Sequence, residues 1–221
     1  MQRTLEPELM DGQEQALAYA AADFSAGDQA LIERLVQLFP DGLGRNLLDL
    51  GCGPGNISFR MAERFAAAEV LGIDGAAAML ALAEQLLDQR PALRPRLRFQ
   101  CRCLPDPTIT GPFSALVSNS LLHHLHEPAV LWQAVLQLGG SGTCVYVKDL
   151  RRPPSPEAAL ALQQLYMVDA PAVLQHDYLA SLHAALTPEE VQQQLEAAGL
   201  AQQLQVAPLE DRYLEVWGRL L

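Results

Sequence analysis

Three alternating glycines placed directly after a short apolar run constrain this chain more than any other feature. Residues 46–50 read NLLDL, and Gly51, Gly53 and Gly55 follow before a helical stripe begins at Ile57. Glycine is needed where the backbone turns tightly and approaches a ligand with no Cβ in the way. The pattern therefore predicts a buried strand, a ligand-contacting loop and a helix in direct succession.

Strand-like and helix-like segments alternate on both sides of this loop. Short apolar or alternating runs, which indicate strands, occupy residues 46–50, 70–74, 97–101, 113–119 and 143–149. Apolar stripes at helical spacing run through residues 28–39, 57–65, 79–87 and 130–138. Such alternation predicts an α/β fold in which a parallel sheet carries helices on both faces. In open parallel sheets, ligands bind at the carboxyl ends of the strands.

The last third of the chain departs from this alternation. Residues 157–168 have a helical pattern, whereas residues 169–186 have no clean period. Thr187 begins a further helix, with Pro188 in its first turn and Glu190 in position for a capping box.

We therefore expect a single domain over residues 1–221. Its predicted parts are an N-terminal helical cap at 1–44, a cofactor-binding core at 45–150, an accessory or lid segment at 151–186, and the last helix with closing strands (201–207 and 212–218) at 187–221. The cap and the accessory segment are expected to lie over the carboxyl edge of the sheet.

Composition and charge exclude several classes of partner. The chain carries 26 acidic and 15 basic residues, a net charge of −11, which disfavours a nucleic-acid partner because that affinity depends on Lys and Arg. No apolar run approaches the roughly 20 residues of a membrane span, and the polar, acidic start does not resemble a secretory signal. We expect a cytoplasmic protein with no membrane partner. The cysteines match no zinc pattern and are interpreted as mostly buried: Cys52, Cys101, Cys103 and Cys144.

Two residues of the glycine loop disfavour a dinucleotide site. The G-x-G-x-x-G fingerprint of such sites needs a third glycine, which lets a helix begin close to a pyrophosphate. Asn56 stands at that position, and Asp49 lies two residues before the first glycine. A carboxylate there repels phosphates but attracts an ammonium group. A nicotinamide-dependent oxidoreductase is therefore a weaker interpretation of this loop.

The loop and a downstream acidic residue resemble the signature motifs of the class I S-adenosylmethionine-dependent methyltransferases. The first motif corresponds to Asp49-x-Gly51-x-Gly53-x-Gly55, and the second to Asp74, which ends the next strand. The resemblance implies a Rossmann-like fold whose seven-stranded, mostly parallel sheet has an antiparallel last strand. It also implies S-adenosylmethionine as cofactor, S-adenosylhomocysteine as product, and ribose hydrogen bonds to Asp74.

The expected cofactor contacts extend beyond these motifs. Residues 117–125 resemble the segment after the fourth strand that faces the methionine end of the cofactor and the substrate. Cys103 stands where relatives often carry an aspartate that contacts adenine, so backbone atoms of Arg102 and Cys103 are expected to hold the ring. Tyr19 is a candidate for a cation–π contact with the sulfonium, with core packing as the alternative. The full predicted set is Asp49, Gly51, Cys52, Gly53, Gly55, Asp74, Gly75, Met79, Arg102, Cys103, Asn119 and Tyr19.

Four residues are candidate catalytic groups. His123 and His124 follow the fourth predicted strand, Asp149 ends the fifth, and Asp177 lies in the aperiodic segment. Each is a candidate general base or acceptor contact, and packing or a surface position is the alternative for each. His126 adds a third histidine, but adjacent side chains point apart and no carboxylate or cysteine completes a familiar metal site. We therefore predict no metal.

Together these features predict a methyltransferase that acts on a small-molecule acceptor by in-line displacement. The alternatives are a non-catalytic cofactor-binding module with a protein partner, and a methyltransferase with a protein substrate. A closed pocket under residues 151–186 would favour a small acceptor, and an open, shallow cleft would favour a protein. The sequence identifies neither the acceptor nor the oligomeric state.

Overall fold

A computed structural model describes all 221 residues and contains one seven-stranded sheet. The strands are β1 (Asn46–Leu50), β2 (Glu69–Asp74), β3 (Leu97–Cys101), β4 (Ala115–Asn119), β5 (Cys144–Leu150), β6 (Leu204–Leu209) and β7 (Tyr213–Arg219). The helices are α1 (Gln13–Ala21), α2 (Ser25–Leu38), α3 (Asn56–Arg64), α4 (Ala77–Asp88), α5 (Ala129–Leu138), α6 (Pro156–Tyr166), α7 (Ala172–Ala184) and α8 (Pro188–Ala197). No helix among them is both long enough and apolar enough to cross a membrane.

The strand order across the sheet is β3-β2-β1-β4-β5-β7-β6. The first five strands pair in parallel, and β7 runs antiparallel to both β5 and β6, which confirms the predicted fold class. The chain builds outward from β1 in one direction through β2 and β3, and in the other through β4 and β5. The order therefore reverses at β1, where a crevice opens beyond the carboxyl ends of the strands.

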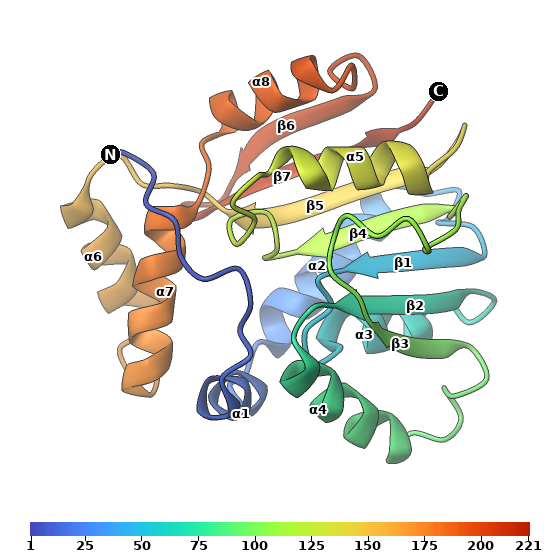
Figure 1. The fold of residues 1–221 in the computed structure, drawn as a ribbon, viewed down its shortest axis with the longest axis horizontal. Helices are drawn as coiled ribbons and strands as arrows, with labels where there is room; N and C mark the ends of the chain where they lie inside the picture. Colours follow the sequence, from blue (N-terminus) through green and yellow to red (C-terminus); the bar gives the residue numbers. More distant parts are fainter.

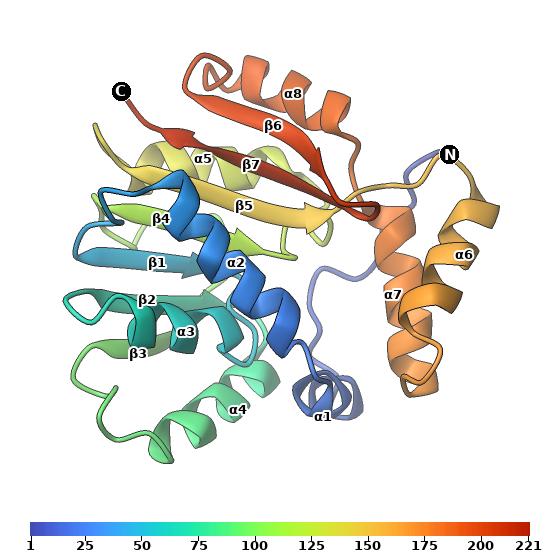
Figure 2. The same ribbon diagram turned by 180° about the vertical axis from the view of Figure 1, so that it is seen from behind.

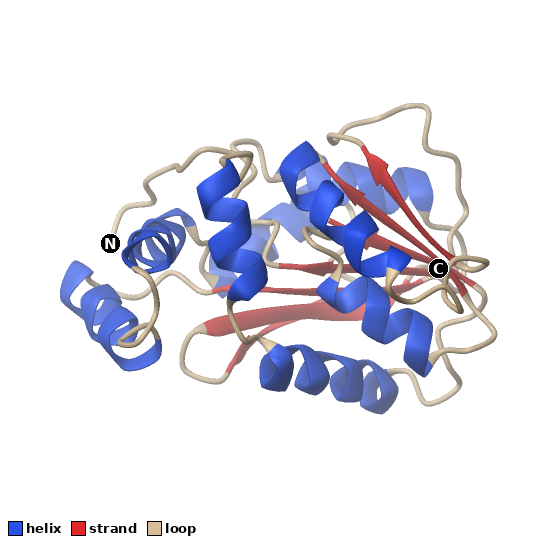
Figure 3. Ribbon diagram, turned by 90° about the horizontal axis from the view of Figure 1, so that it is seen from below, coloured by secondary structure: helices blue, strands red, loops and turns tan.

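Two hydrophobic clusters cover the two faces of the sheet. Successive side chains of a strand point to opposite faces, so in β1 Leu47 joins one cluster and Leu48 the other. Helices α2, α3 and α4 contribute to the cluster that contains Leu47, and α5 and α8 to the one that contains Leu48. Figure 1 shows α5 and α8 in front of the sheet, and Figure 2 shows α2 and α3 on the other side. In the view from below, the sheet lies between these helical layers (Figure 3).

The segment predicted to lack periodicity contains a helix. Within residues 169–186, α7 covers Ala172–Ala184 and buries Leu174, Tyr178 and Leu182. This helix packs against α6 on one side and α1 on another, so it needs apolar side chains on more than one face, which blurs the helical period. Helices α1, α6 and α7 gather beyond the carboxyl ends of the strands (Figures 1 and 2).

Residues 1–12 form an extended segment rather than part of a helical cap, because the first helix begins at Gln13. Figure 1 shows this segment, in dark blue, descending between α7 and the carboxyl edge of the sheet to α1. Helix α2, also inside the expected cap, packs instead on a sheet face against α3. Of the region 1–44, only the extended segment and α1 therefore lie over the edge.

Helix α8 begins with the capping box predicted from the sequence. Oγ1 of Thr187 accepts a hydrogen bond from the backbone N–H of Glu190 at 3.3 Å, and the Glu190 carboxylate accepts one from the backbone N–H of Thr187 at 2.9 Å. These bonds satisfy donors that the first turn of a helix leaves without partners. The cap fixes where α8 starts and thus how it lies on the sheet.

Replacing Thr187 with alanine removes the side-chain acceptor of this cap. We expect Thr187→Ala to lower the free energy of unfolding by about 1 kcal/mol, measured by urea denaturation. Thr187→Ser keeps an acceptor oxygen and should unfold close to the wild type. Equal stabilities for the alanine and serine variants would show that the cap contributes nothing.

Candidate active site

A cleft of about 210 Å³ lies at the carboxyl ends of β1, β2 and β4. It is lined by the glycine loop, by the turns after β2 and β3, by the segment after β4 and by residues near the N-terminus. All the predicted cofactor-binding residues line this cleft except Gly55. The topology brings them together because the strands that carry them are neighbours in one parallel sheet.

The glycine loop has a backbone that other residues adopt only with strain. Gly51, Gly53 and Gly55 have φ values of +72°, +52° and +89°. A Cβ on Gly55 would lie 2.8 Å from the Phe99 ring, so this glycine serves packing at the start of α3. A Cβ on Gly53 would meet no atom within 4 Å, so its Cα faces open space. Gly53 is thus the point where a ligand can approach the backbone closely.

The carboxylate of Asp74 links the glycine loop to the turn after β2. Its Oδ2 accepts a hydrogen bond from the N–H of Gly53 at 2.8 Å, and its Oδ1 accepts one from the N–H of Ala76 at 2.8 Å. Burial raises the pKa of Asp74, and these two hydrogen bonds oppose the shift. Each carboxylate oxygen has further acceptor capacity, so Asp74 can still accept hydrogen bonds from a ligand in the cleft.

Asp49 lies beneath the glycine loop and is only 1 % exposed. The Ser58 hydroxyl donates a hydrogen bond to its Oδ2 at 2.6 Å. Burial raises the pKa of Asp49 to about 7, and the nearby charges of Asp74 and Asp28 push it the same way. Its carboxyl group therefore changes protonation near neutral pH, and a cationic ligand beside it would favour the ionised form.

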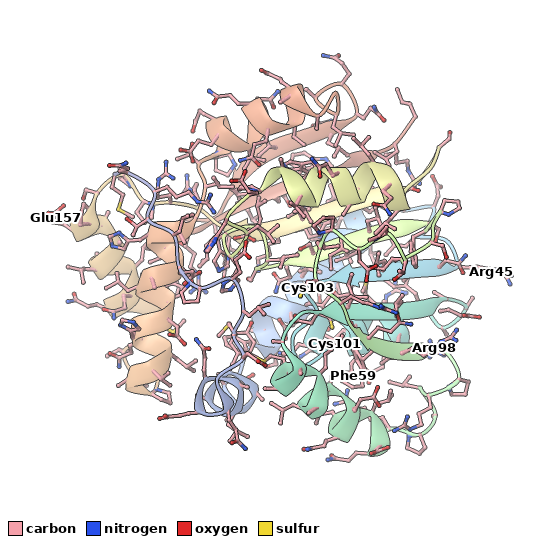
Figure 4. All side chains as sticks on the ribbon, in the orientation of Figure 1. Arg45, Phe59, Arg98, Cys101, Cys103 and Glu157 are labelled. Carbon is pink, nitrogen blue, oxygen red and sulfur yellow. The ribbon has the colours of Figure 1, made fainter.

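The end of the cleft nearest β3 is formed by the residues that follow this strand. Arg102, Cys103 and Leu104 all line it, and the N–H of Arg102 donates to the carbonyl of Asp74 at 2.9 Å. Figure 4 shows Cys101 and Cys103 toward the carboxyl end of the sheet, away from Arg45 and Arg98 near the other end. The prediction of mostly buried cysteines was wrong for this pair, because both are exposed where β3 leaves the sheet.

The N-terminal segment, which belongs to the region 1–44 expected to lie over the carboxyl edge of the sheet, covers part of the cleft. Glu8, Leu9 and Met10 line it, and Leu9 lies so close to Gly75 that a Cβ there would be 2.7 Å from a Leu9 methyl carbon. No residue of 151–186 lines the cleft. An irregular, acidic stretch carries no periodic signal, so its position could not be inferred from its own sequence.

The four candidate catalytic residues occupy different environments. His124 lines the cleft, whereas His123 is buried behind it with its Nδ1 2.5 Å from Oδ1 of Asp149. The other Asp149 oxygen accepts a hydrogen bond from the N–H of Leu122 at 2.7 Å. Asp177 lies outside the cleft and accepts a hydrogen bond from Gln15 at 2.7 Å, joining α7 to α1.

The pKa values of the two adjacent histidines are shifted in opposite directions. It lowers the pKa of His123, but the Asp149 carboxylate outweighs it, and the pKa ends above its usual value. Burial and the neighbouring His123 lower the pKa of His124 to about 3. His124 is therefore a neutral imidazole at neutral pH.

Comparison with known proteins agrees with this geometry. Residues 47–140 match the family described as "Methyltransferase domain". The chain is 37 % identical over 105 residues to the trans-aconitate 2-methyltransferase of Deinococcus radiodurans, covering 45 % of this chain and 37 % of that protein. It is 30 % identical over 145 residues to the enzyme of that name from Azoarcus sp., covering 62 % and 56 %. The chain thus spans from about a third to just over half of the length of these two curated relatives.

Solved structures share the fold over nearly the whole chain. The plantazolicin methyltransferase BamL, crystallised with S-adenosylhomocysteine, superposes with a TM-score of 0.70 at 17 % identity, covering 92 % of this chain and 90 % of that one. A methyltransferase from Aquifex aeolicus gives a TM-score of 0.64 at 14 % identity, covering 93 % and 98 %. These matches support the resemblance to class I S-adenosylmethionine-dependent methyltransferases, and the solved structures show that the chain has their fold.

The residues of the cleft fit S-adenosylmethionine, the cofactor of the methyltransferases that the chain resembles. The Cα of Gly53 faces open space, as a close approach to a ligand requires. Asp74 retains acceptor capacity for hydroxyl donors, and Asp49 supplies negative charge beside the loop. The cleft carries no lysine and only one arginine, Arg102, so it is poorly suited to a pyrophosphate.

A side chain on Gly53 should block the cleft. We expect Gly53→Ala to weaken S-adenosylhomocysteine binding at least tenfold by calorimetry, because the methyl group points into the ligand space. The positive φ should also cost about 1–2 kcal/mol of stability. Gly199→Ala is the matched control, since Gly199 has φ +72°, has no atom within 4 Å of its Cβ position and lies outside the cleft. Equal affinities in the two variants would place the ligand elsewhere.

Asp49 should make the stability of the ligand-free protein depend on pH. Its folded-state pKa of about 7 exceeds the unfolded value of about 3.9, so its contribution is complete below pH 4 and is lost as the pH rises through 7. We expect the free energy of unfolding to fall by up to about 1.4 kcal/mol per pH unit across this window. Asp49→Asn, which cannot titrate, should show a flatter profile in urea titrations at pH 5, 6, 7 and 8. Identical slopes would rule out titration of Asp49.

Proposed function

We propose that the protein transfers the methyl group of S-adenosylmethionine to a small-molecule acceptor. The observation that carries this proposal is the cleft itself, in which the glycine loop, Asp49 and Asp74 meet under a cover formed by residues 8–10. The segment 151–186, expected to close over a small acceptor, does not line the cleft, so the proposal depends on the cover by residues 8–10, which suits a small acceptor better than a folded protein surface. The curated relatives, named for trans-aconitate and for ubiquinone biosynthesis, support the same class.

The protein contributes mainly position and charge to such a reaction. The bound cofactor would supply an electrophilic methyl group. The acceptor would attack the methyl carbon in line with the sulfur, and S-adenosylhomocysteine would be the leaving group. Asp74 would hold the ribose, and the open backbone at Gly53 would allow close approach. Tyr19 lines the cleft and can present its ring to a cation. Holding two reactants in line supplies a large part of the acceleration without further chemistry.

The state of His124 favours an acceptor that is already ionised. His124 is the one candidate catalytic group in the cleft wall, and a pKa of about 3 makes it a weak base. A carboxylate acceptor needs no proton removed before its oxygen attacks the methyl carbon. We therefore infer a carboxylic acid acceptor, with O-methylation to an ester.

A buried cation on β5, outside the residues that line the cleft, is a candidate partner for such an acceptor. Lys148 is 8 % exposed and makes no hydrogen bond or ion pair, and its ammonium lies 4.0 Å from the centre of the Tyr213 ring. Burial lowers its pKa, while acidic residues that include the cleft residue Asp28 oppose that shift. An acceptor carboxylate would give this buried ammonium an anionic partner.

The proposal can be tested with methyl-labelled cofactor and pooled metabolites separated by class. We expect label in small carboxylic acids, released as methanol by mild alkali because methyl esters hydrolyse. Asp74→Ala should abolish the signal, and it should weaken S-adenosylhomocysteine binding by roughly 1.5–3 kcal/mol. Lys148→Met should raise KM for the acid more than it lowers kcat. If the label resisted mild alkali, the acceptor would be a hydroxyl, an amine or a thiol, and the inference of a carboxylate acceptor would be wrong. Cofactor binding without any methylated product would indicate a binding module.

A further inference from the structure

The fold brings a carboxylate from the N-terminus to the two adjacent histidines that follow β4. Oε1 of Glu6 lies 3.5 Å from Nε2 of His123 and 3.2 Å from Nδ1 of His124. These three side chains are only 9 %, 3 % and 13 % exposed. The sequence around the histidines did not indicate this carboxylate, because Glu6 lies more than a hundred positions before them.

The donor atoms of this cluster lack the hydrogen bonds that buried polar atoms normally make. Oε1 of Glu6 and Nδ1 of His124 are both buried and take part in no hydrogen bond. Such atoms are uncommon in folded proteins and point to a missing partner. The second oxygen of Glu6, by contrast, accepts a hydrogen bond from Ser181 at 3.2 Å. The missing partner therefore belongs on the side of Glu6 that faces the histidines.

The distances in the cluster are compatible with a metal site. Four-coordinate zinc has ligand bonds of about 2.0–2.1 Å, so neighbouring ligand atoms lie roughly 3.3–3.4 Å apart. The two distances from Oε1 of Glu6 bracket this value, and all three donor atoms lie within 4.8 Å of one another. Two imidazoles and one carboxylate form a ligand set suited to zinc and related ions, with a fourth position left for water or a ligand.

The surroundings of His123 match what metal-binding histidines require. Such a histidine usually donates its other ring N–H to a carboxylate, which fixes the tautomer and the ring orientation. Nδ1 of His123 is 2.5 Å from Asp149, which is itself held by the N–H of Leu122. In the neutral tautomer with that N–H, the Nε2 lone pair faces Oε1 of Glu6 at 3.5 Å, so the space between these two acceptors takes either a ring proton or a metal cation.

We propose that Glu6, His123 and His124 bind a divalent transition-metal ion, zinc by their ligand set, which fastens the N-terminal segment at the edge of the cleft. Glu6 stands two residues before the part of that segment that lines the cleft, and His124 is itself in the cleft wall. The ion would thus connect the segment to the loop after β4. Metal binding at this site requires neither the cofactor nor the acceptor, so it stands apart from the proposed methyl transfer.

The test uses the full chain, free of any affinity tag and stripped with a chelator. Calorimetry with zinc chloride should give one site per chain with an affinity of micromolar or better, and zinc should raise the Tm of the stripped protein. Cobalt(II) in the same site should show the intense visible absorption of four-coordinate geometry. Glu6→Gln and His124→Gln should each weaken zinc binding at least a hundredfold and abolish the Tm increase.

His176→Gln is the matched control, because His176 is exposed and lies outside the cluster, on α7. This variant should bind zinc like the wild type. An equal loss in His176→Gln would assign the binding to surface histidines and overturn the proposal. Absence of zinc binding to the stripped wild type would also overturn it, and would leave an imidazolium of His123 paired with Glu6. Both outcomes are read without any activity measurement, so they are independent of methyl transfer.

Discussion

The hydrogen bond from the N–H of Gly53 to the Asp74 carboxylate is the interaction on which the cleft depends. It joins the loop after β1 to the turn after β2, two segments that the parallel sheet places side by side. A second contact reinforces it, because the N–H groups of Gly51 and Cys52 donate to the carbonyl of Ile73. The left-handed backbone at Gly53 directs its N–H to Asp74 while its Cα faces the cleft. Gly53 alone thus meets two requirements: it adopts the backbone conformation of the loop, and it leaves space for a ligand to approach.

Acidic groups are concentrated around this loop, which gives the cleft its chemical character. Asp49 and Asp74 are mostly buried and Asp28 lines the same space, so each raises the energy of ionising the others. Next to Asp49 and Asp74, a cationic group of the cofactor would lower that energy and would be favoured over an anionic group. The charge that disfavours a pyrophosphate beside the loop would also attract the ammonium and sulfonium groups of S-adenosylmethionine.

Local signals made much of this molecule predictable, and long-range contacts account for what was missed. The NLLDL run, the alternating glycines and the Thr187 capping box each act within a few residues, and each structure formed where expected. Helix α7 has no clean helical period in the sequence because its apolar residues face several neighbours rather than one sheet. The cover at Leu9 and the carboxylate of Glu6 depend on partners far along the chain. Nothing in an acidic, irregular stretch specifies where it will lie once the rest has folded.

The N-terminal segment, residues 1–12, contacts α7, the loop after β4 and the wall of the cleft. Arg3 donates to the carbonyls of Ala184, His123 and Leu125, which fixes the segment to α7 and to the loop after β4 before any ion is considered. Leu9, a few residues on, then reaches Gly75 in the cleft wall. If a metal at Glu6 and the cofactor under Leu9 both favour the docked segment, each must strengthen the binding of the other by the same factor. The three Arg3 hydrogen bonds already favour the docked segment. The larger the docked fraction is without metal, the smaller is the factor by which a metal can strengthen cofactor binding.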